Sequence, residues 1–381
     1  MKISGLNVYY VGTRKPEDWS YPIIKIETDE GISGVGECPN VGIGVFGAFK
    51  QMKNYLVGKD PFNIEKIRLD LRGQAHGGVN PGPVWNSAFS AVEIALWDIK
   101  GKALETPLYN LIGGRVNDKI RVYSNGWFIG CKTPDDYGKA AEMVVEDGFT
   151  ALKFYPVGFE GERRLSPKRE NEVENIVKAV RDAVGNEVDI MVDGGKLELP
   201  AAIKLGRRLE KYHPLWLEEP VAPGNAVALA SVARSVDIPI AAGENLWTKE
   251  SFREHFEKGA FSVVQPDVGC VGGIFETLKI AAMADSYLLP VAPHNPNGPI
   301  LGAATAHLGA SLTNFMIMEF CTYKEPHRDP LWLWDIIDFC YEKQYMKRKD
   351  GYIEVMAQPG LGVELNEDVA EKHVNLRQVN F

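Results

Sequence analysis

The stretch PLWLEEP (Pro214–Pro220) is a short apolar run of the kind that fills a buried β-strand, and it ends in two adjacent carboxylates. Burying ionised carboxylates costs several kcal/mol unless a cation or a network of hydrogen bonds meets them. Either this strand end reaches solvent, or a positive group lies beside Glu218 and Glu219. The rest of the chain has to decide between these two interpretations.

Similar apolar runs alternate with amphipathic segments from about residue 119 onward, at spacings of roughly 25 residues. In chain order the runs are KIRVYSNGWF, FTALKFYP, VDIMVDGG, PLWLEEP, IPIAAGE, FSVVQPDV, LLPVAPH and NFMIMEF. Helix-like segments such as ENEVENIVKAVRDAVG separate them. Eight strand–helix units whose strands are apolar on both faces predict a (β/α)8 barrel, the TIM barrel, over residues 119–352.

Residues 1–118 show a different pattern, which indicates a separate α+β domain. YPIIKIETDEGISGVGE predicts a hairpin that turns at Asp29–Gly31, and AFKQMKNYLVG and PVWNSAFSAVEIALWDIKGKAL predict helices. The barrel pattern stops after about Tyr352, where QPGLGVEL is typical of a loop and a short strand. We therefore expect the tail, residues 353–381, to pack back on the first domain.

One motif of the first domain has the pattern of a nucleotide-binding loop. GIGVFG (Gly42–Gly47) fits GxGxxG, but a dinucleotide site needs a tight strand–turn–helix within a βαβ unit. Cys38, Pro39 and Asn40 separate the motif from the preceding strand, and more helix follows it. A glycine-rich surface loop is the better interpretation.

Composition limits the partners and the location of the protein. The 381 residues carry a formal net charge of −9, whereas nucleic acid and anionic membranes reward clustered Lys and Arg, so neither is an expected partner. No apolar stretch approaches the roughly 20 residues of a membrane span, and the N-terminus lacks the features of a signal peptide. The five cysteines are scattered and never form a CxxC pair, which suits a reducing compartment. We expect a cytoplasmic enzyme.

Ionisable residues end seven of the eight predicted strands, and barrel active sites lie at that rim. In order they are Lys153 with Tyr155, Asp193, Glu218 with Glu219, Glu244, Asp267, His294 and Glu319. Asp193, a glutamate of LEEP and Glu244 make an all-oxygen set that suits Mg²⁺. A metal ion rather than solvent is therefore expected beside LEEP. The alternation of apolar residues does not choose between Glu218 and Glu219.

The remaining strand-end residues have acid–base chemistry. Asp267 and His294 end successive strands, and a carboxylate bonded to an imidazole makes a general base near neutral pH. Lys153 and Tyr155 are expected on one face of the site, with Glu319 either a protonated donor or an anion partner. A metal, bases and acids together suit proton abstraction beside a carboxylate. Lys196 is a further candidate for substrate contact, whereas structural or surface roles are expected for His76, His213, His255, His307, His327 and His373.

The ordered motifs DGG, LEEP, AGEN, QPDVGCVGG, APHNPNGP and MEF closely resemble the enolase superfamily, mandelate racemase subgroup, over essentially the whole chain. IKIETDEGISGVGE and SAVEIALWDIKGKALETPLYNLIGG are similar to its capping domain. The resemblance implies that the first domain and the tail form a cap on the barrel. It implies that Asp267 and His294 form the catalytic dyad. It implies that Lys153, the first lysine of the KxK motif, and Glu319, as a hydrogen-bond donor, lie beside the substrate carboxylate. The Mg²⁺ ligands that it implies are Asp193, Glu218 and Glu244.

Two positions depart from the family pattern. Tyr155 replaces the second lysine of the KxK motif, which argues against a simple racemase because racemisation needs acid–base groups on both faces. The motif PHNPNGP resembles that of galactonate dehydratases. Those enzymes carry a histidine that acts as general acid at the position where this chain has Gly195. The acid for a leaving hydroxyl is then expected to be Tyr155, or His294 returning its own proton.

The resemblance implies a Mg²⁺-dependent acid-sugar dehydratase that converts its substrate to a 2-keto-3-deoxy acid through an enediolate. Capping loops, here GTRKPEDWS and NVGIGVFG, are expected to select the substrate, and relatives suggest a homo-oligomer. One alternative is an epimerase, racemase or anhydro-sugar cycloisomerase on the same scaffold. Another is a non-catalytic barrel homologue, although such a protein has no need of buried charges.

Overall fold

The computed structural model describes residues 1–12, 20–39, 41–74, 82–158, 161–321, 337–338 and 349–372. The chain begins with an antiparallel sheet in the order β1 (Ile3–Gly12), β2 (Ser20–Thr28) and β3 (Ser33–Glu37). The turn between β2 and β3 contains Gly31 at φ +81°, which confirms the predicted hairpin. GTRKPEDWS and the start of NVGIGVFG lie largely outside the described residues.

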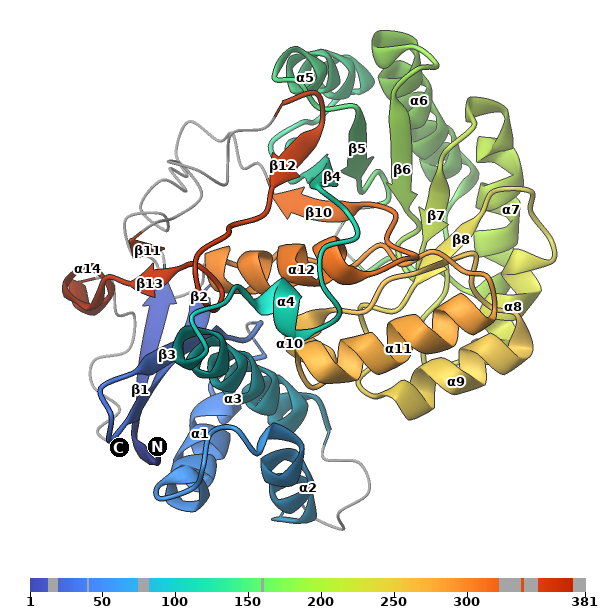
Figure 1. The fold of residues 1–381 in the computed structure, drawn as a ribbon. Coiled ribbons are helices and arrows are strands. Elements are labelled where there is room, and N and C mark those ends of the chain that lie inside the picture. The colour runs from blue at the N-terminus through green and yellow to red at the C-terminus, as the bar shows by residue number, and fades with distance from the viewer. Residues whose placement is uncertain are drawn as a thin grey trace.

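Helices cover one face of this sheet (Figure 1). The helices in contact with the sheet are α1 (Gly44–Leu56) and α3 (Gly82–Ala103). Helix α2 (Ile64–Gln74) packs against both of them, and the short α4 (Leu108–Leu111) packs against α3. The alternating glycines of GISGVGE explain the close approach of α3. A Cβ at Gly34 would lie 2.1 Å from the Ala95 carbonyl oxygen, and a Cβ at Gly36 would lie 1.9 Å from that of Ala91. The sheet is antiparallel, so GIGVFG does not belong to a parallel βαβ unit.

Seven parallel strands of the second region follow one another in chain order around a barrel. They are β4 (Lys119–Asn125), β5 (Ala151–Phe154), β6 (Asp189–Asp193), β7 (Trp216–Glu218), β8 (Ile240–Ala242), β9 (Val263–Val264) and β10 (Met318–Cys321). Val291 fills the eighth position, because it bridges Val264 on one side and Phe315 on the other. Since β10 pairs with β4, the ring closes and the predicted barrel is confirmed.

Helices surround the barrel (Figure 1). They are α5 (Pro134–Glu146), α6 (Pro167–Val184), α7 (Leu199–Leu209), α8 (Ala226–Ala233), α9 (Lys249–Lys258), α10 (Val268–Val271), α11 (Ile274–Ser286) and α12 (Pro299–Ser311), with a 3₁₀ turn at Glu210–Tyr212. In the part of the chain that the structure describes, the helices are too short or too polar to cross a membrane.

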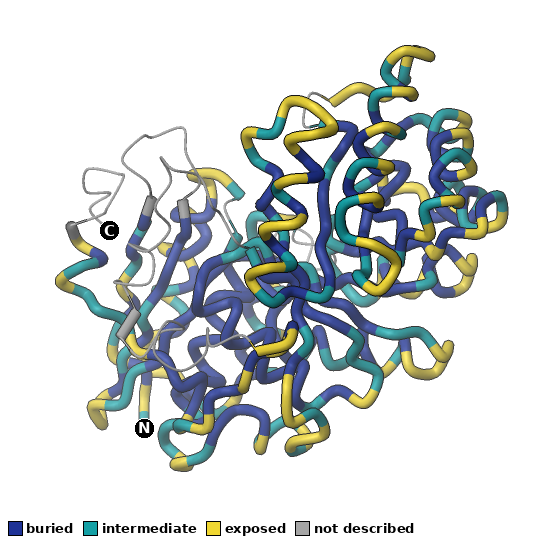
Figure 2. The backbone as a smooth tube through the Cα atoms, turned by 90° about the horizontal axis from the view of Figure 1, so that it is seen from above, coloured by how far each residue is buried: buried dark blue, intermediate teal, exposed yellow. Residues whose placement is uncertain are grey.

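Side chains fill the interior of the barrel, and the strands around it are largely buried (Figure 2). One fully or almost fully buried side chain from each strand position forms a single layer: Tyr123, Ala151, Met191, Trp216, Ala241, Val263, Ala292 and Ile317. Tyr123 and Trp216 meet edge to face, with ring centroids 5.6 Å apart. This layer is the floor on which the polar strand ends rest.

The tail contacts both regions. Strand β12 (Tyr352–Glu354) pairs with β4 of the barrel, whereas β13 (Glu364–Leu365) pairs with β11 (Ile337–Asp338). Beyond them α14 (Glu367–Lys372) lies against β1, and Glu367 accepts hydrogen bonds from Tyr9 and Lys25. We propose domain boundaries near residues 118 and 352, with the tail joining the first sheet after residue 360.

Candidate active site

The predicted strand-end residues gather at one rim of the barrel, where the carboxyl ends of the parallel strands meet. Lys153, Asp193, Glu218 and Glu319 belong to β5, β6, β7 and β10, while Tyr155, Glu244, Asp267 and His294 follow β5, β8, β9 and the Val291 position. All of them are buried or half-buried. Ion pairs and hydrogen bonds connect most of them into one cluster.

His294 and Asp267 make direct contact. Nδ1 of His294 lies 2.8 Å from Oδ2 of Asp267, and Asn297 Nδ2 donates to the same oxygen at 3.0 Å. The backbone N–H of Gly269 donates to Oδ1 at 2.8 Å, so Asp267 also caps α10. Because a carboxylate only accepts hydrogen bonds, Nδ1 of His294 carries a proton, so any proton that the ring takes up or gives back is exchanged at Nε2.

Nε2 of His294 faces the other carboxylates. It lies 3.0 Å from Glu244 Oε2 and 3.8 Å from Glu319 Oε2. Burial by itself lowers the pKa of His294, but the charges of Glu244 and Glu319 and the hydrogen bond to Asp267 outweigh it, so the pKa is well above its usual range.

Lys153 is the cation beside LEEP in this structure. Its Nζ lies 2.6 Å from Glu218 Oε1 and 2.9 Å from Glu319 Oε1, and the side chain is buried. Glu218 also accepts from Trp216 Nε1 at 2.9 Å and Gln265 Nε2 at 2.8 Å. A positive group rather than solvent therefore meets the carboxylate at the end of β7.

Glu319 is an acceptor in this geometry. Besides Lys153, it receives hydrogen bonds from Asn125 Nδ2 at 2.5 Å and the Asn295 backbone N–H at 2.8 Å. Burial raises the pKa of Glu319, but Lys153 and His294 together hold it below its usual value. This geometry favours the anion-partner interpretation over a protonated donor.

The two glutamates of LEEP point to different partners. Glu219 contacts Lys196 Nζ at 3.2 Å and accepts from Asn245 Nδ2 at 2.7 Å, both through Oε2. Lys196 Nζ also lies 3.1 Å from Glu244 Oε1, so it joins the outer side of the cluster while remaining partly exposed. Glu218 is thus the glutamate that meets Lys153 and Gln265 of the barrel strands.

Asp193 and Tyr155 lie on the side of the cluster near β5 and β6. Burial and the charges of Glu218 and Glu244 raise the pKa of Asp193 well above its usual range. Burial, together with the negative charge of Asp193, raises the pKa of Tyr155 to about 12. Tyr155 is partly buried against the core, and the effect of the Asp193 charge on its pKa places the two groups on the same side of the cluster.

Several polar partners of this cluster were not predicted, among them Asn125, Asn245, Gln265, Asn297 and the ion-pair role of Lys196. A signal for three of them was present. Asn125 ends the one strand that had no ionisable residue assigned, Asn245 follows Glu244 directly, and Gln265 stands two residues before Asp267. Amide side chains do not titrate, so the pattern of ionisable strand ends did not point to them.

The donor chemistry of Asp193, Glu218 and Glu244 suits a hard cation, since all three offer carboxylate oxygens from successive strands. Among the described residues, however, the structure shows no set of three His, Cys, Asp or Glu side chains grouped as a ready metal site. Lysine ammonium groups lie between the carboxylates: Lys153 bridges Glu218 and Glu319, and Lys196 bridges Glu219 and Glu244.

The described histidines outside the cluster have other environments. His213 is exposed, whereas His255 lies buried between the Ser251 and Pro223 carbonyl oxygens, each 2.8 Å away. His307 is buried between α4 and the tail. His76, His327 and His373 lie outside the described residues.

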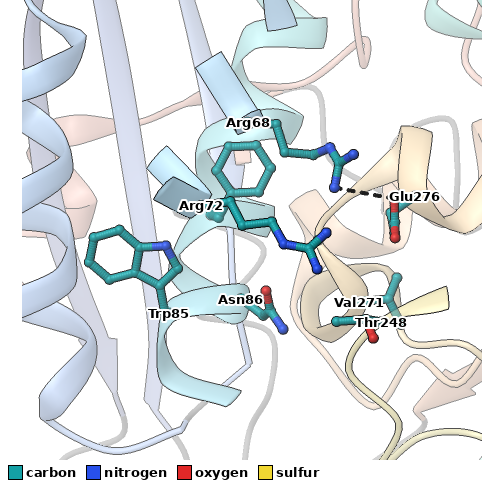
Figure 3. A pocket seen from close by; sticks show the side chains of 9 residues that line it. Arg68, Arg72, Trp85, Asn86, Thr248, Val271 and Glu276 are labelled. Carbon is teal, nitrogen blue, oxygen red and sulfur yellow. Dashed lines mark ion pairs between the residues drawn. The ribbon is translucent and has the colours of Figure 1, made fainter. Parts of the chain in front are cut away.

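A small pocket lies at the seam between the first domain and the barrel, lined by residues of α2, α3, α10 and α11 and by the N-cap of α9 (Figure 3). Its volume of about 20 Å³ has room for about one water molecule. Arg68 Nη1 lies 3.5 Å from the buried Glu276, and Asn86 Nδ2 donates to the Trp247 carbonyl at 3.1 Å. These contacts hold the two regions together, away from the strand-end cluster.

Family comparisons agree with the barrel and with the separate first domain. Residues 136–369 match the family described as enolase C-terminal domain-like, and residues 10–113 match the mandelate racemase / muconate lactonizing enzyme N-terminal domain. The chain therefore belongs to the enolase superfamily, in its mandelate racemase group.

Its relatives narrow the class further. The chain is 36% identical to the D-galactonate dehydratase of Pectobacterium atrosepticum and 32% identical to the D-gluconate/D-galactonate dehydratase of Picrophilus torridus, in each case over 97% of this chain and 93% of the relative. A crystal structure of an enolase-superfamily member from Salmonella Typhimurium superposes with a TM-score of 0.89 at 34% identity, covering 97% of this chain and 98% of that one. The protein is an enzyme of the hydro-lyase class, a dehydratase.

Proposed function

We propose that this protein is a Mg²⁺-dependent dehydratase of sugar acids that produces a 2-keto-3-deoxy acid. The carrying observation is the contact between His294 and Asp267, which fixes the imidazole with Nε2 toward a bowl of charged groups. The relatives named as galactonate and gluconate dehydratases support a sugar-acid substrate.

Residues of this chain take part in substrate binding and proton transfer. Lys153 binds the substrate carboxylate and offsets the negative charge that develops on it. His294, oriented by Asp267, removes the proton from the α-carbon. The β-hydroxyl leaves as water, taking a proton from His294 or from Tyr155, and the resulting enol tautomerises to the ketone.

Asp193, Glu218 and Glu244 would hold the Mg²⁺ ion, which supplies Lewis-acid stabilisation of an enediolate when bound. The pairing of Asp193 with Glu218 across β6 and β7 supports this assignment, because it places two carboxylates at one level of the rim. A cytoplasmic location and assembly into a homo-oligomer belong to the same proposal.

The test is a screen of the purified protein, with Mg²⁺, against mono- and di-acid sugars in D₂O. Semicarbazide absorbance reports 2-keto product, and NMR reports loss of the α-proton. We expect keto product from at least one galactonate- or gluconate-like acid, and no turnover in EDTA until Mg²⁺ is restored. Deuterium incorporation without keto product would reassign the protein as an epimerase, and an anhydro-sugar that opens without loss of water would indicate a cycloisomerase.

A further inference from the structure

Three buried carboxylates of the first domain bind backbone N–H groups of other parts of the chain. Glu37 ends β3, while Glu93 and Asp98 lie on α3, and all three are fully buried. Glu37 accepts from the start of α12, Glu93 from the start of α11, and Asp98 from Leu361 of the tail. None of them belongs to the strand-end cluster, and the proposed mechanism uses none of them.

Glu37 makes the most extensive of these contacts. Its Oε1 accepts from the Gly298 N–H at 2.5 Å, and its Oε2 accepts from Ile300 and Leu301 at 3.0 and 3.2 Å. These donors are the otherwise unsatisfied N–H groups of the first turn of α12. Gly298 permits the approach, because a Cβ there would lie 2.6 Å from Oε1. A carboxylate of the first domain thus caps a barrel helix.

The capped residues continue directly into the loop that carries His294. Between His294 and Gly298 lies Asn297, which donates to Asp267 Oδ2 at 3.0 Å. Proline at positions 296 and 299 restricts the backbone on both sides of this asparagine. A displacement of Gly298 therefore moves Asn297, and with it the carboxylate that orients the imidazole.

The same segment of the first domain also contacts the loop of the second dyad member. Pro39 packs over Gly269, where a Cβ would lie 2.5 Å from Pro39 Cδ. The Gly269 N–H in turn donates to Asp267 Oδ1 at 2.8 Å. Residues 37–39 thus contact the loops of both His294 and Asp267.

We propose that Glu37 is a positioning residue for the dyad: by holding Gly298 and the first turn of α12, it sets the hydrogen bond between His294 and Asp267. The segment Glu37–Pro39 leads into NVGIGVFG, the loop expected to contact substrate, so the first domain acts on the base as well as on specificity. This inference rests on the proposed role of His294 as base.

Glu93 provides a matched control. It is equally buried, accepts from the Ile274 and Phe275 N–H groups at 2.8 and 2.9 Å, and caps the start of α11. Burial raises the pKa of both carboxyls to about 7 against the effect of these hydrogen bonds, so the two sites are electrostatically alike. Of these two glutamates, only Glu37 contacts the segment that continues into the loop of His294.

The experiment compares Glu37→Gln with Glu93→Gln in the full-length protein. Glutamine keeps the shape but turns an NH₂ group toward backbone donors, so both variants should lose similar thermal stability. For Glu37→Gln alone we expect kcat for dehydration to fall about 10- to 100-fold while KM changes little, the effect typical of losing a partner that orients a reactive group. Equal losses of kcat in the two variants, or no loss in Glu37→Gln, would overturn the proposal.

A second readout does not depend on turnover. NMR of protein labelled with ¹⁵N-histidine reports the Nδ1–H proton of His294, which is assigned by its absence from His294→Asn. We expect this resonance to shift in Glu37→Gln and in Pro39→Ala. The Pro39→Ala variant removes no buried polar group, so it tests the proposal even if Glu37→Gln fails to fold. An unchanged resonance in both variants would contradict the positioning role of Glu37. If the wild-type enzyme turned over none of the sugar acids, the proposed function would be wrong, but this NMR comparison could still be made.

Discussion

His294 contacts the carboxylates of Asp267 and Glu244 at 2.8 and 3.0 Å, one through each ring nitrogen. Such an arrangement fixes the plane of the ring and leaves little freedom for rotation about the side chain. The ring is therefore preorganised for proton transfer, since Nε2, the nitrogen that would exchange the proton, already points into the bowl. Replacing the ring tests this assignment most directly.

In His294→Asn, the amide keeps part of the hydrogen bonding to Asp267 but cannot take up a proton. We expect the rate of α-proton exchange in D₂O to fall by about 10²- to 10⁴-fold, the usual contribution of a general base. The control is His213→Asn at an exposed residue whose φ of +48° asparagine tolerates well. Full exchange activity in His294→Asn would show that another group is the base.

The position of a site residue was predictable where the barrel architecture alone determines it. Parallel strands end at one rim, so Lys153 and His294 could be assigned to a common site without knowing any contact. Alternation in the strand did not choose between the two LEEP glutamates, because both preceding residues are apolar. The family resemblance singled out Glu218, although as a metal ligand and not as the partner of Lys153. Glu37 shows the same signal as Glu218, a carboxylate ending an apolar run, but its partner Gly298 is 261 residues away in the sequence.

At the scale of elements, α3 is the central support of the first domain. Most of its residues from Asn86 to Gly101 are buried, since the sheet covers one side and the barrel and tail cover others. Gly101 lies against the tail: a Cβ there would be 2.5 Å from Gly360 Cα and 2.7 Å from Gly360 N. Backbone atoms cannot give way as a flexible side chain can.

Gly101→Ala should therefore lower the free energy of unfolding by about 1–3 kcal/mol, the range for overpacking a close contact. Gly47→Ala is the matched change in α1, where nothing lies within 4 Å of the new methyl group. There the higher helix propensity of alanine should raise stability by about 0.5–1 kcal/mol. Urea unfolding of both variants measures the difference, and the same sign of change in both would refute the packing argument.

Helices and strands were predicted best where the segment is long and its apolar residues recur at regular spacing. The hairpin and the helices of the first domain follow from alternation and helical spacing, and the eight barrel positions follow from the repeat. The strand in LLPVAPH is the limiting case, because only Val291 forms bridges there. The pairing of β12 with β4 was not predicted, since Tyr352–Glu354 carries no signal of its partner.

At the scale of the whole molecule, α12 joins three parts of the chain. Its N-terminus receives Glu37 of the first domain, and further along it His307 contacts both α4 and the tail. The Tyr109 N–H donates to Nδ1 of His307 at 3.4 Å, and Nε2 donates to the Leu361 carbonyl at 3.2 Å. The neutral imidazole fits both partners, whereas a protonated ring has no lone pair for Tyr109.

Burial therefore lowers the pKa of His307 from its ordinary 6.5 to about 4, despite the hydrogen bond to Leu361. Between these two values the unfolded chain binds more protons than the folded one, so stability falls as the pH falls. The contribution is complete above about pH 6.5 and is lost progressively toward pH 4. At about 1.36 kcal/mol per pK unit, the loss by pH 4.5 is on the order of 2–3 kcal/mol.

His307→Gln isolates this effect, because glutamine does not titrate while the buried Glu37 and Glu93 titrate alike in both proteins. Their raised pKa values of about 7 act in the opposite direction, so the wild-type curve alone would not reveal the histidine. Urea unfolding at pH 4.5, 5.5 and 7 should show the wild-type protein losing stability relative to His307→Gln as the pH falls. Parallel curves would mean that the contacts joining α12, α4 and the tail tolerate a charged imidazole, and that acid weakens the assembly elsewhere.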